Sequence, residues 1–343
     1  MLEIDASYGE GGGQMVRMAV ALAAATGRAI GLRNIRIKRD KPGLAPQHMT
    51  AVRAVAALSN AQIEGLELRS QALRFTPRGL MGGVHRFEVG TAGSITLVLQ
   101  ALLPVMIACG RSVEVSVSGG SDVRQAPSID YFANVLLPLL ARMGAAPRLD
   151  LIHRGYYPRG GGEVRLTLAP GKLRAVSLDA AGPLIAIEGC AHVANLPEHI
   201  ATRMRDAALE RLHAVAEVAP RISAQVLDPA DANGTGGGIV VWARTQNTVL
   251  GAGRVAERGA RAETLGASVG DELASDLVAG STVDLHACDQ LLVYLALVGG
   301  GSCLARSVTS HAHAAMWLIE QFLPVRFVIA PQGGLMRVSV RPR

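Results

Sequence analysis

The residues best suited to chemistry lie in a few short polar segments, and the first is the glycine-rich stretch YGEGGGQMVR (8–17). Its glycines would let the backbone approach a phosphate closely, Glu10 could hold a divalent cation, and Arg17 would lie in the helix that follows. The stretch lacks both the Lys-Ser/Thr of a P-loop and the spacing of a dinucleotide-binding motif. A turn needed only for tight packing explains the pattern equally well, so phosphate binding is one of two open interpretations.

A second segment, RNIRIKRDKPGLAPQH (33–48), gathers positive charge around an expected strand end. Because side chains alternate along a strand, Arg36 and Lys38 would share one side. A solvated charged surface usually mixes both signs, whereas only Asp40 interrupts the positive charges here. The segment therefore favours binding of a triphosphate or an RNA backbone, just before a helix expected to begin near residues 46–47. Its basic residues are Arg33, Arg36, Lys38, Arg39 and Lys41.

Two further polar segments open apolar helices. In HACDQ (286–290), Asp289 would be either an ordinary partner of the helix dipole or a functional carboxylate. In TSHAHAAMW (309–317), Ser310 is a plausible N-cap, and His311 and His313 point to different helix faces, which disfavours a shared metal. Most isolated histidines are structural, but a neutral imidazole in a positively charged pocket can attack phosphorus. The local pattern does not separate the two histidines in that role.

These polar segments begin helices of a loose internal repeat. Each repeat runs from a polar or glycine-rich turn into an apolar helix, and a second helix follows after a strand. The sequence predicts an α/β (α+β) fold with a large domain of three repeated βαβα-type units, whose helices pack on sheets. The glycine-rich turns place several helix N-termini, with free N–H groups, where an anion could bind. The first helices are expected within 9–27, 90–110 and 286–301, the second within 47–61, 128–145 and 311–324, and intervening strands within 29–37 and 112–119.

A segment from about residue 180 to about residue 279 interrupts the repeat with a pattern of its own. We expect residues 180–279 to form a small inserted α/β domain, which leaves a discontinuous large catalytic domain at 1–179 and 280–343. Within the insert we expect strands at 184–193, 222–227 and 238–244, helices at 197–216 and 260–279, and a loop at 228–238.

The composition is that of a folded protein and excludes a disordered chain. Of the 343 residues, 49% are hydrophobic and only 3% aromatic, so Ala, Leu and Val must fill the interior of about two domains. The net charge of +6 is compatible with a polyanionic partner. The start of the chain lacks a signal-peptide pattern, and the apolar run 95–109 is too short to span a bilayer. We therefore expect no membrane partner, and a homodimer is a possible assembly.

The spacing of the cysteines indicates the redox environment in which the protein works. They are widely separated and form no CxxC pair, so neither a structural zinc site nor a disulfide framework is expected. A reducing cytoplasmic location is the simplest expectation. The four residues are Cys109, Cys190, Cys288 and Cys303.

Seven segments, read in order, resemble the RNA 3′-terminal phosphate cyclase family. They are GEGGGQMVR, KPGLAPQHMTAV, GTAGSITLVLQ, SGGSD, GYYPRGGGEV, DQLLVYLALVGGGS and HAHAAMWLIEQFLPVRF, and together they extend over nearly the whole chain. The resemblance implies an enzyme that uses ATP and Mg²⁺ or Mn²⁺ on RNA 3′-phosphate ends. It implies transfer of AMP to a histidine, transfer of that AMP to the RNA to give RNA-ppA, and attack by the vicinal 2′-hydroxyl. The products are a 2′,3′-cyclic phosphate and AMP.

The resemblance also assigns roles to residues. The nucleophile corresponds to His311, counted back from EQFLPVRF, and not to His313. Glu10 corresponds to a glutamate associated with the divalent metal. The phosphate and RNA-end positions are Arg17, Arg36, Gln47 and His48, and the nucleotide positions are Gln100, Pro127, His286, Asp289 and Gln290.

Two positions depart from the family pattern. His286 stands where members often have a tyrosine that can stack on adenine, and an imidazole stacks less broadly. Ala314 and Ala315 stand where members commonly have Thr followed by Asn or Ala, so we expect looser support around the nucleophile.

Two alternatives are weighed against this function. A non-catalytic relative with the same fold acts as a binding protein in ribosomal RNA processing, but such relatives lack the histidine and its pocket, here His311, Glu10 and Arg17. Enolpyruvyl transferases share the repeat architecture, but they need no nucleotidyl histidine, and likeness of fold alone would not separate the two.

Overall fold

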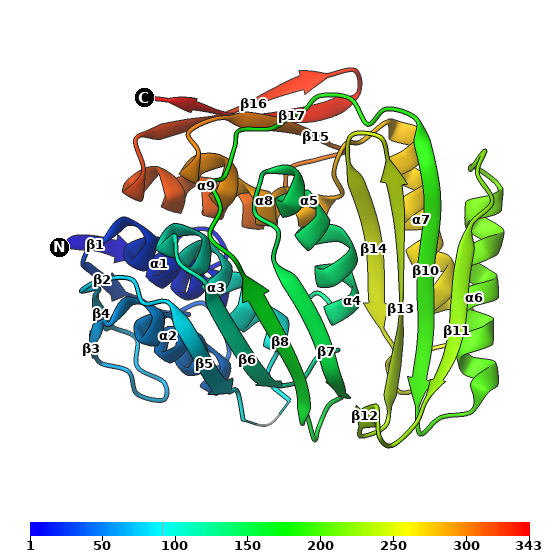
Figure 1. Cartoon of the computed structure of the whole chain (residues 1–343), viewed down its shortest axis with the longest axis horizontal. Helices are drawn as coiled ribbons and strands as arrows, with labels where there is room; N and C mark the ends of the chain where they lie inside the picture. The colour runs from blue at the N-terminus through cyan, green and yellow to red at the C-terminus, as the bar shows by residue number, and fades with distance from the viewer. Residues whose placement is uncertain (91) are drawn as a thin grey trace.

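The computed structural model describes residues 1–90 and 92–343, and most of them fold into three units of the same design (Figure 1). In each unit a helix connects two parallel strands, a second helix follows, and two antiparallel strands complete a sheet. The three sheets have equivalent strand orders, β1-β2-β4-β3, β5-β6-β8-β7 (extended by β12) and β9-β15-β17-β16. The predicted α/β (α+β) fold of repeated units is therefore confirmed.

Each unit is made of helices and strands with the following bounds. Unit one contains β1 (Leu2–Asp5), α1 (Gly13–Thr26), β2 (Ile30–Arg33), α2 (Pro46–Ser59), β3 (Gln62–Glu64) and β4 (Leu73–Thr76). Unit two contains β5 (Gly83–Glu88), α3 (Ile95–Cys109), β6 (Val113–Gly119), α4 (Ile129–Tyr131), the π-helix η1 (Phe132–Leu136), α5 (Leu137–Arg142), β7 (Arg148–Gly155) and β8 (Gly162–Leu168). Unit three contains β9 (Ser177–Leu178), α8 (Leu285–Leu297), β15 (Gly301–Ala305), α9 (Ser310–Phe322), β16 (Val325–Gln332) and β17 (Leu335–Pro342).

The helices of the three units meet in the middle of the molecule. Helix α1 packs against α2, α3 and α9, and α8 packs against α9 and α3. Helices α1 and α3 end at Gly27 and Gly110, whose φ angles of 69° and 64° are in the left-handed region that glycine adopts without strain. Contact between α1 and α9 brings the start of the chain beside its last helix, although about 300 residues separate them. In the described ranges, no helix is both long and apolar enough to cross a bilayer.

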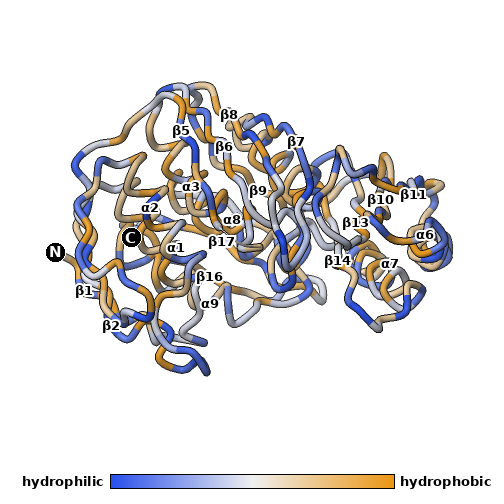
Figure 2. Tube along the Cα trace, turned by 90° about the horizontal axis from the view of Figure 1, so that it is seen from below, coloured by the Kyte–Doolittle hydropathy of each residue, from blue (hydrophilic) through white to orange (hydrophobic). Residues whose placement is uncertain are grey.

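The third unit is interrupted between β9 and α8 by a separate sheet with the strand order β11-β10-β13-β14. Two helices, α6 and α7, cover one face of this sheet, and Figure 2 shows the segment as an extension at one end of the molecule. Its own apolar core includes Ile187, Met204, Leu250 and Leu273. The elements are β10 (Leu184–Ala194), α6 (Glu198–His213), β11 (Arg221–Leu227), β12 (Ala232–Asn233), β13 (Gly236–Thr245), β14 (Val249–Val255) and α7 (Ala262–Ala279).

Three local features differ from the expectations. The strand expected at 29–37 ends at Arg33, and Arg36 lies in a turn with a φ of 53°, so Arg36 and Lys38 share no strand face. The helix expected at 128–145 widens into the π-helix η1 just before Pro138, because a proline has no N–H to continue the α-helical ladder. The loop expected at 228–238 contains β12, which pairs with β7.

Candidate active site

His311 lies in the first turn of α9, directly against the glycine-rich start of α1. Its Nδ1 is 2.9 Å from Gln14 Oε1, and its Nε2 is 3.6 Å from Glu10 Oε2. Glu10 is held from the other side by Ser310, whose hydroxyl donates to Oε1. The Ser310 hydrogen bond, with the nearby His311 and Arg39, lowers the pKa of Glu10, so its carboxylate is charged at neutral pH. The arrangement places an imidazole, an amide and a carboxylate in one exposed cluster.

The N-terminus of α1 is open toward this cluster. Gly12 is its N-cap, and neither a side-chain cap nor an acidic residue in the first turn neutralises this end of the helix in the described structure. Two cations from the basic segment reach the same turn: Lys38 Nζ donates to Gly9 O at 3.0 Å, and Arg39 Nη2 lies 3.3 Å from Glu10 Oε2. An open helix N-terminus flanked by cations binds anions such as phosphates.

His48 and Arg17 form a second layer behind the glycine turn. A Cβ placed on Gly13 would lie 2.0 Å from Nε2 of His48, so the imidazole packs directly on the α1 backbone and only glycine fits there. His48 Nδ1 accepts the Ala45 N–H at 3.1 Å. Burial, together with the charges of Arg17 and Arg36, lowers the pKa of His48 to about 3, so this imidazole is neutral. Arg36 itself donates to the carbonyl oxygens of Lys41 and Gly43 within its own turn.

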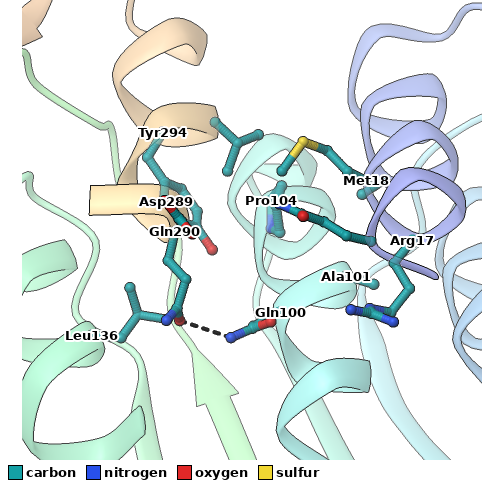
Figure 3. Close-up of a pocket in the computed structure, with 12 residues that line it drawn as sticks. Arg17, Met18, Gln100, Ala101, Pro104, Leu136, Asp289, Gln290 and Tyr294 are labelled. Carbon is teal, nitrogen blue, oxygen red and sulfur yellow. Dashed lines mark hydrogen bonds between the residues drawn. The ribbon is translucent and has the colours of Figure 1, made fainter. Parts of the chain in front are cut away.

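A pocket opens between α1, α3 and α8 (Figure 3). Gln100 Nε2 donates to Gln290 Oε1 at 2.8 Å across it, as the dashed line in the figure marks. Gln14 lines the pocket and also contacts His311, so the imidazole lies at the edge of the pocket. The lining residues are Gln14, Arg17, Met18, Ala21, Gln100, Ala101, Pro104, Leu136, Asp289, Gln290, Val293 and Tyr294.

Asp289 links the pocket to the start of α9. The Thr309 hydroxyl donates to both of its oxygens, at 2.7 and 2.9 Å, and Thr309 Oγ1 accepts the Ala312 N–H as the N-cap of α9. Burial raises the pKa of Asp289 to about 6. In the described parts of the chain, no Lys or Arg forms an ion pair with Asp289, and such a perturbed carboxylate in a pocket is typical of a functional site.

The structure brings together most of the expected site residues, but not all. Glu10, His311 and the pocket residues Arg17, Gln100, Asp289 and Gln290 form one contiguous region, with His48 behind it. The other four predicted positions, which are Arg36, Gln47, Pro127 and His286, lie outside the pocket lining.

Gln47 lies in the first turn of α2, beside Gly93. The carbonyl oxygen of Pro127 accepts a hydrogen bond from Thr96 at the start of α3, 2.7 Å away. The half-exposed His286 has its Nε2 3.9 Å from Glu272 Oε1 in α7 and meets Tyr131 edge-on. The roles of these three residues, like those of all the predicted site residues, stay predictions.

Sequence reasoning missed several members of the cluster. Gln14 belongs to the GEGGGQ segment but was given no role, although it is the contact that orients the imidazole. The N-cap of α9 is Thr309 and not Ser310, because the helix begins one residue earlier than expected, and the Ser310 hydroxyl binds Glu10 instead. Lys38 and Arg39 were among the basic residues expected to bind phosphate, but their contacts with Gly9 and Glu10 could be predicted only by knowing that the strand ends at Arg33.

Comparisons with known proteins agree with this geometry. The family model described as RNA 3′-terminal phosphate cyclase matches residues 8–329. A protein of Nitrosospira multiformis named RNA 3′-terminal phosphate cyclase is 51% identical, covering 100% of this chain and 97% of that protein. A protein of the same name from Hyperthermus butylicus is 42% identical, covering 100% of this chain and 97% of that protein. Another from Methanococcoides burtonii is 38% identical, covering 99% of this chain and 100% of that protein. This chain therefore belongs to the RNA 3′-terminal phosphate cyclase family.

Proposed function

We propose that this chain catalyses the ATP-dependent conversion of an RNA 3′-terminal phosphate to a 2′,3′-cyclic phosphate. The observation that carries the proposal is the position of His311. Its imidazole lies between Gln14 and Glu10, against the open N-terminus of α1 and at the edge of a pocket. A nucleophile, an anion-binding helix end and a ligand pocket are thus adjacent, which is what nucleotidyl transfer to a side chain requires.

The pocket suits the adenosine part of ATP. Met18 and Tyr294 contribute apolar surface, and the amides of Gln100 and Gln290 can donate to and accept from the edge of a base. These amides bond to each other in the structure, so a base bound there would replace this contact with its own hydrogen bonds. Asp289 offers a carboxylate acceptor on the same wall.

The turn beside the pocket suits the phosphates. Burial lowers the pKa of Arg17 to about 10, so its guanidinium is still charged at neutral pH and adds to the charge of Lys38 and the α1 N–H groups. Glu10 would hold Mg²⁺ or Mn²⁺, which would neutralise charge on the phosphates while they react.

The contacts of His311 support Nε2 as the attacking atom. With Gln14 Oε1 as the acceptor, Nδ1 carries the proton, and Nε2 has the free lone pair. Attack by Nε2 on the α-phosphorus of ATP forms an N–P bond and breaks the P–O bond to pyrophosphate. An oxygen of the RNA 3′-phosphate then displaces His311 from the AMP phosphorus to give RNA-ppA. The vicinal 2′-hydroxyl attacks the activated 3′-phosphate and expels AMP, which closes the cyclic phosphate.

Neither alternative function has an observation in its favour. A binding protein for ribosomal RNA would need no imidazole oriented by an amide beside a carboxylate, as His311 is by Gln14 and Glu10. An enolpyruvyl transferase would share the repeated units, but the relatives that match this chain over its whole length are named cyclases.

The experiment is a conversion assay with an RNA oligonucleotide that carries a 3′-phosphate. We expect that ATP and Mg²⁺ or Mn²⁺ make the end resistant to phosphatase, and that omitting ATP prevents this. An oligonucleotide ending in a 2′-deoxy-3′-phosphate lacks the attacking hydroxyl and should accumulate as the adenylylated form. If the folded protein leaves the RNA end sensitive to phosphatase under all of these conditions, the proposed function is wrong.

The remaining expectations about organisation are also proposals. We propose that residues 180–279 are an inserted domain of a discontinuous catalytic domain, which is supported by the separate core around Met204 and Leu273. The four cysteines are free thiols, which supports the proposed cytoplasmic location. A homodimer also stays a proposal, and the molar mass in solution, measured by light scattering, tests it.

A further inference from the structure

A cluster of buried polar side chains lies far from His311, where the inserted sheet meets unit two. Cys190 and His192 project from β10, Asp130 comes from α4, and Asp122 comes from the segment between β6 and α4. Arg154 of β7 donates to both carboxylates: its Nη1 and Nη2 are each 2.8 Å from Asp130, and Nη1 is 3.2 Å from Asp122 Oδ2. The mechanism proposed above uses none of these residues.

Several atoms of this cluster are buried without a partner. The His192 side chain is only 1% exposed, yet neither ring nitrogen has a hydrogen-bond partner in the described residues. Oδ1 of Asp122, whose side chain is 0% exposed, is also unsatisfied in the part of the chain described. Leaving a polar group buried and unpaired is costly, so two such side chains facing each other point to a missing partner.

The spacing of the candidate donor atoms fits a metal ion. A carboxylate oxygen of Asp130, the Cys190 sulfur and a ring nitrogen of His192 all lie within 4.8 Å of one another. His192 Nδ1 is 3.8 Å from Asp130 Oδ2. Metal–ligand bonds of about 2.0–2.3 Å in a tetrahedron require donor atoms about 3.3–3.8 Å apart, so small side-chain movements would bring these three donors to the spacing of a tetrahedral site, whose fourth position a water would fill.

The charge of the cluster also calls for a cation. Two carboxylates and one guanidinium leave one net negative charge in a buried place, where an uncompensated charge is costly. A divalent cation bound with a Cys190 thiolate would bring the sum to zero.

We propose that Asp130, Cys190 and His192 bind a zinc ion that joins the inserted sheet to unit two. Nitrogen, sulfur and carboxylate donors are the ligands zinc prefers. His192 would ligate through Nδ1, and its Nε2–H would donate to Asp122 Oδ1, now 3.9 Å away, while Arg154 holds the Asp130 carboxylate in place. Because the ligands are far apart in sequence and form no CxxC pair, the cysteine pattern alone argued against zinc, and only the fold brings them together.

The test uses zinc itself and cobalt(II) as its coloured substitute. Protein purified from zinc-supplemented cells should contain about one zinc per chain, and cobalt(II) added to the stripped protein should give a thiolate charge-transfer band. Cys190→Ser and His192→Ala should lose the retained metal, and Cys190→Ser should lose the band. The matched control Cys109→Ser, at the end of α3, should keep both.

Stripping and reloading the wild-type protein covers the case in which the variants do not fold. We expect a chelator to lower the thermal midpoint and stoichiometric zinc to restore it. Wild-type protein that carries no zinc and gives no cobalt band on titration would overturn the proposal. Metal binding that persists in both Cys190→Ser and His192→Ala would overturn it as well, because the ion would then lie elsewhere. None of these readouts depends on the cyclase activity.

Discussion

Replacing Asp289 with Asn should make the protein more stable and less active. The carboxylate lies in the wall of the pocket, and the Thr309 hydroxyl is its hydrogen-bond donor. Burial raises its pKa from 3.8 to about 6. Since the folded state holds this proton more tightly than the unfolded state, the group contributes stability below about pH 4, and that contribution disappears as the pH rises through about 6.

The magnitude follows from the size of the shift. About two pKa units correspond to roughly 3 kcal/mol of stability that the wild type loses between about pH 4 and about pH 6. An asparagine keeps the size of the side chain and a carbonyl oxygen for the Thr309 hydroxyl, but it carries no charge to bury. Asp289→Asn should therefore gain up to about 3 kcal/mol over the wild type at about pH 8, and it should bind ATP more weakly because an acceptor in the pocket is lost.

The assay is chemical denaturation of both proteins at a series of pH values. Asp276→Asn is the contrasting control, because Asp276 is fully buried and burial raises its pKa too, but it pairs with Arg306, Nε to Oδ1 at 2.6 Å. Its replacement also breaks an ion pair, so it should gain less stability than Asp289→Asn. An Asp289→Asn variant no more stable than the wild type at about pH 8, with the same dependence on pH, would refute the reasoning.

Three further substitutions test the cluster. Gly13→Ala would place a Cβ 2.0 Å from His48 Nε2 and should displace that ring, so we expect the conversion rate to fall at least about tenfold because of overpacking. If the displaced ring is the cause, the double variant Gly13→Ala/His48→Ala should have the same rate as His48→Ala. Thr309→Val removes both the N-cap of α9 and the hydrogen bond to Asp289, so the free energy of unfolding measured by chemical denaturation should fall by about 2 kcal/mol. Thr309→Ser keeps the hydroxyl and should stay close to the wild type. Glu10→Gln keeps an acceptor for Ser310 but loses charge, so the Mn²⁺ concentration for half-maximal conversion should rise at least about tenfold, and an unchanged requirement would remove Glu10 from the metal site.

The regular elements were predictable because their signals are local. The apolar run of α3 ends at Gly110, and apolar residues alternate with polar ones along β6 so that one face of the strand is buried. The sequence predicted both elements. The turn at Arg36 was missed because a left-handed residue that is not glycine leaves no mark in the hydrophobic pattern. The π-helix η1 was missed because the hydrophobic pattern does not show how a helix accommodates a proline: α3 stays α-helical around Pro104, whereas the helix before Pro138 widens.

The candidate active site was predicted mainly from the resemblance to a known family and not from local sequence patterns. Local pattern alone did not separate His311 from His313, and the resemblance to a known family made that choice. The structure adds contacts that neither source supplied, because they join units far apart in the chain, such as Gln14 with His311 and Thr309 with Asp289. The buried cluster around His192 was invisible for the same reason, since its members come from α4, β7 and β10.

The covalent step at His311 is tested most directly by labelling the protein with ATP that carries a radioactive α-phosphate. With Mg²⁺ or Mn²⁺, we expect an acid-labile, base-stable label that mass spectrometry locates on His311. His311→Ala should abolish the label while keeping the fold, and the matched control His313→Ala, an exposed histidine in the same helix turn, should keep it. A His311→Ala variant that labels as well as the wild type would contradict the assignment of the nucleophile.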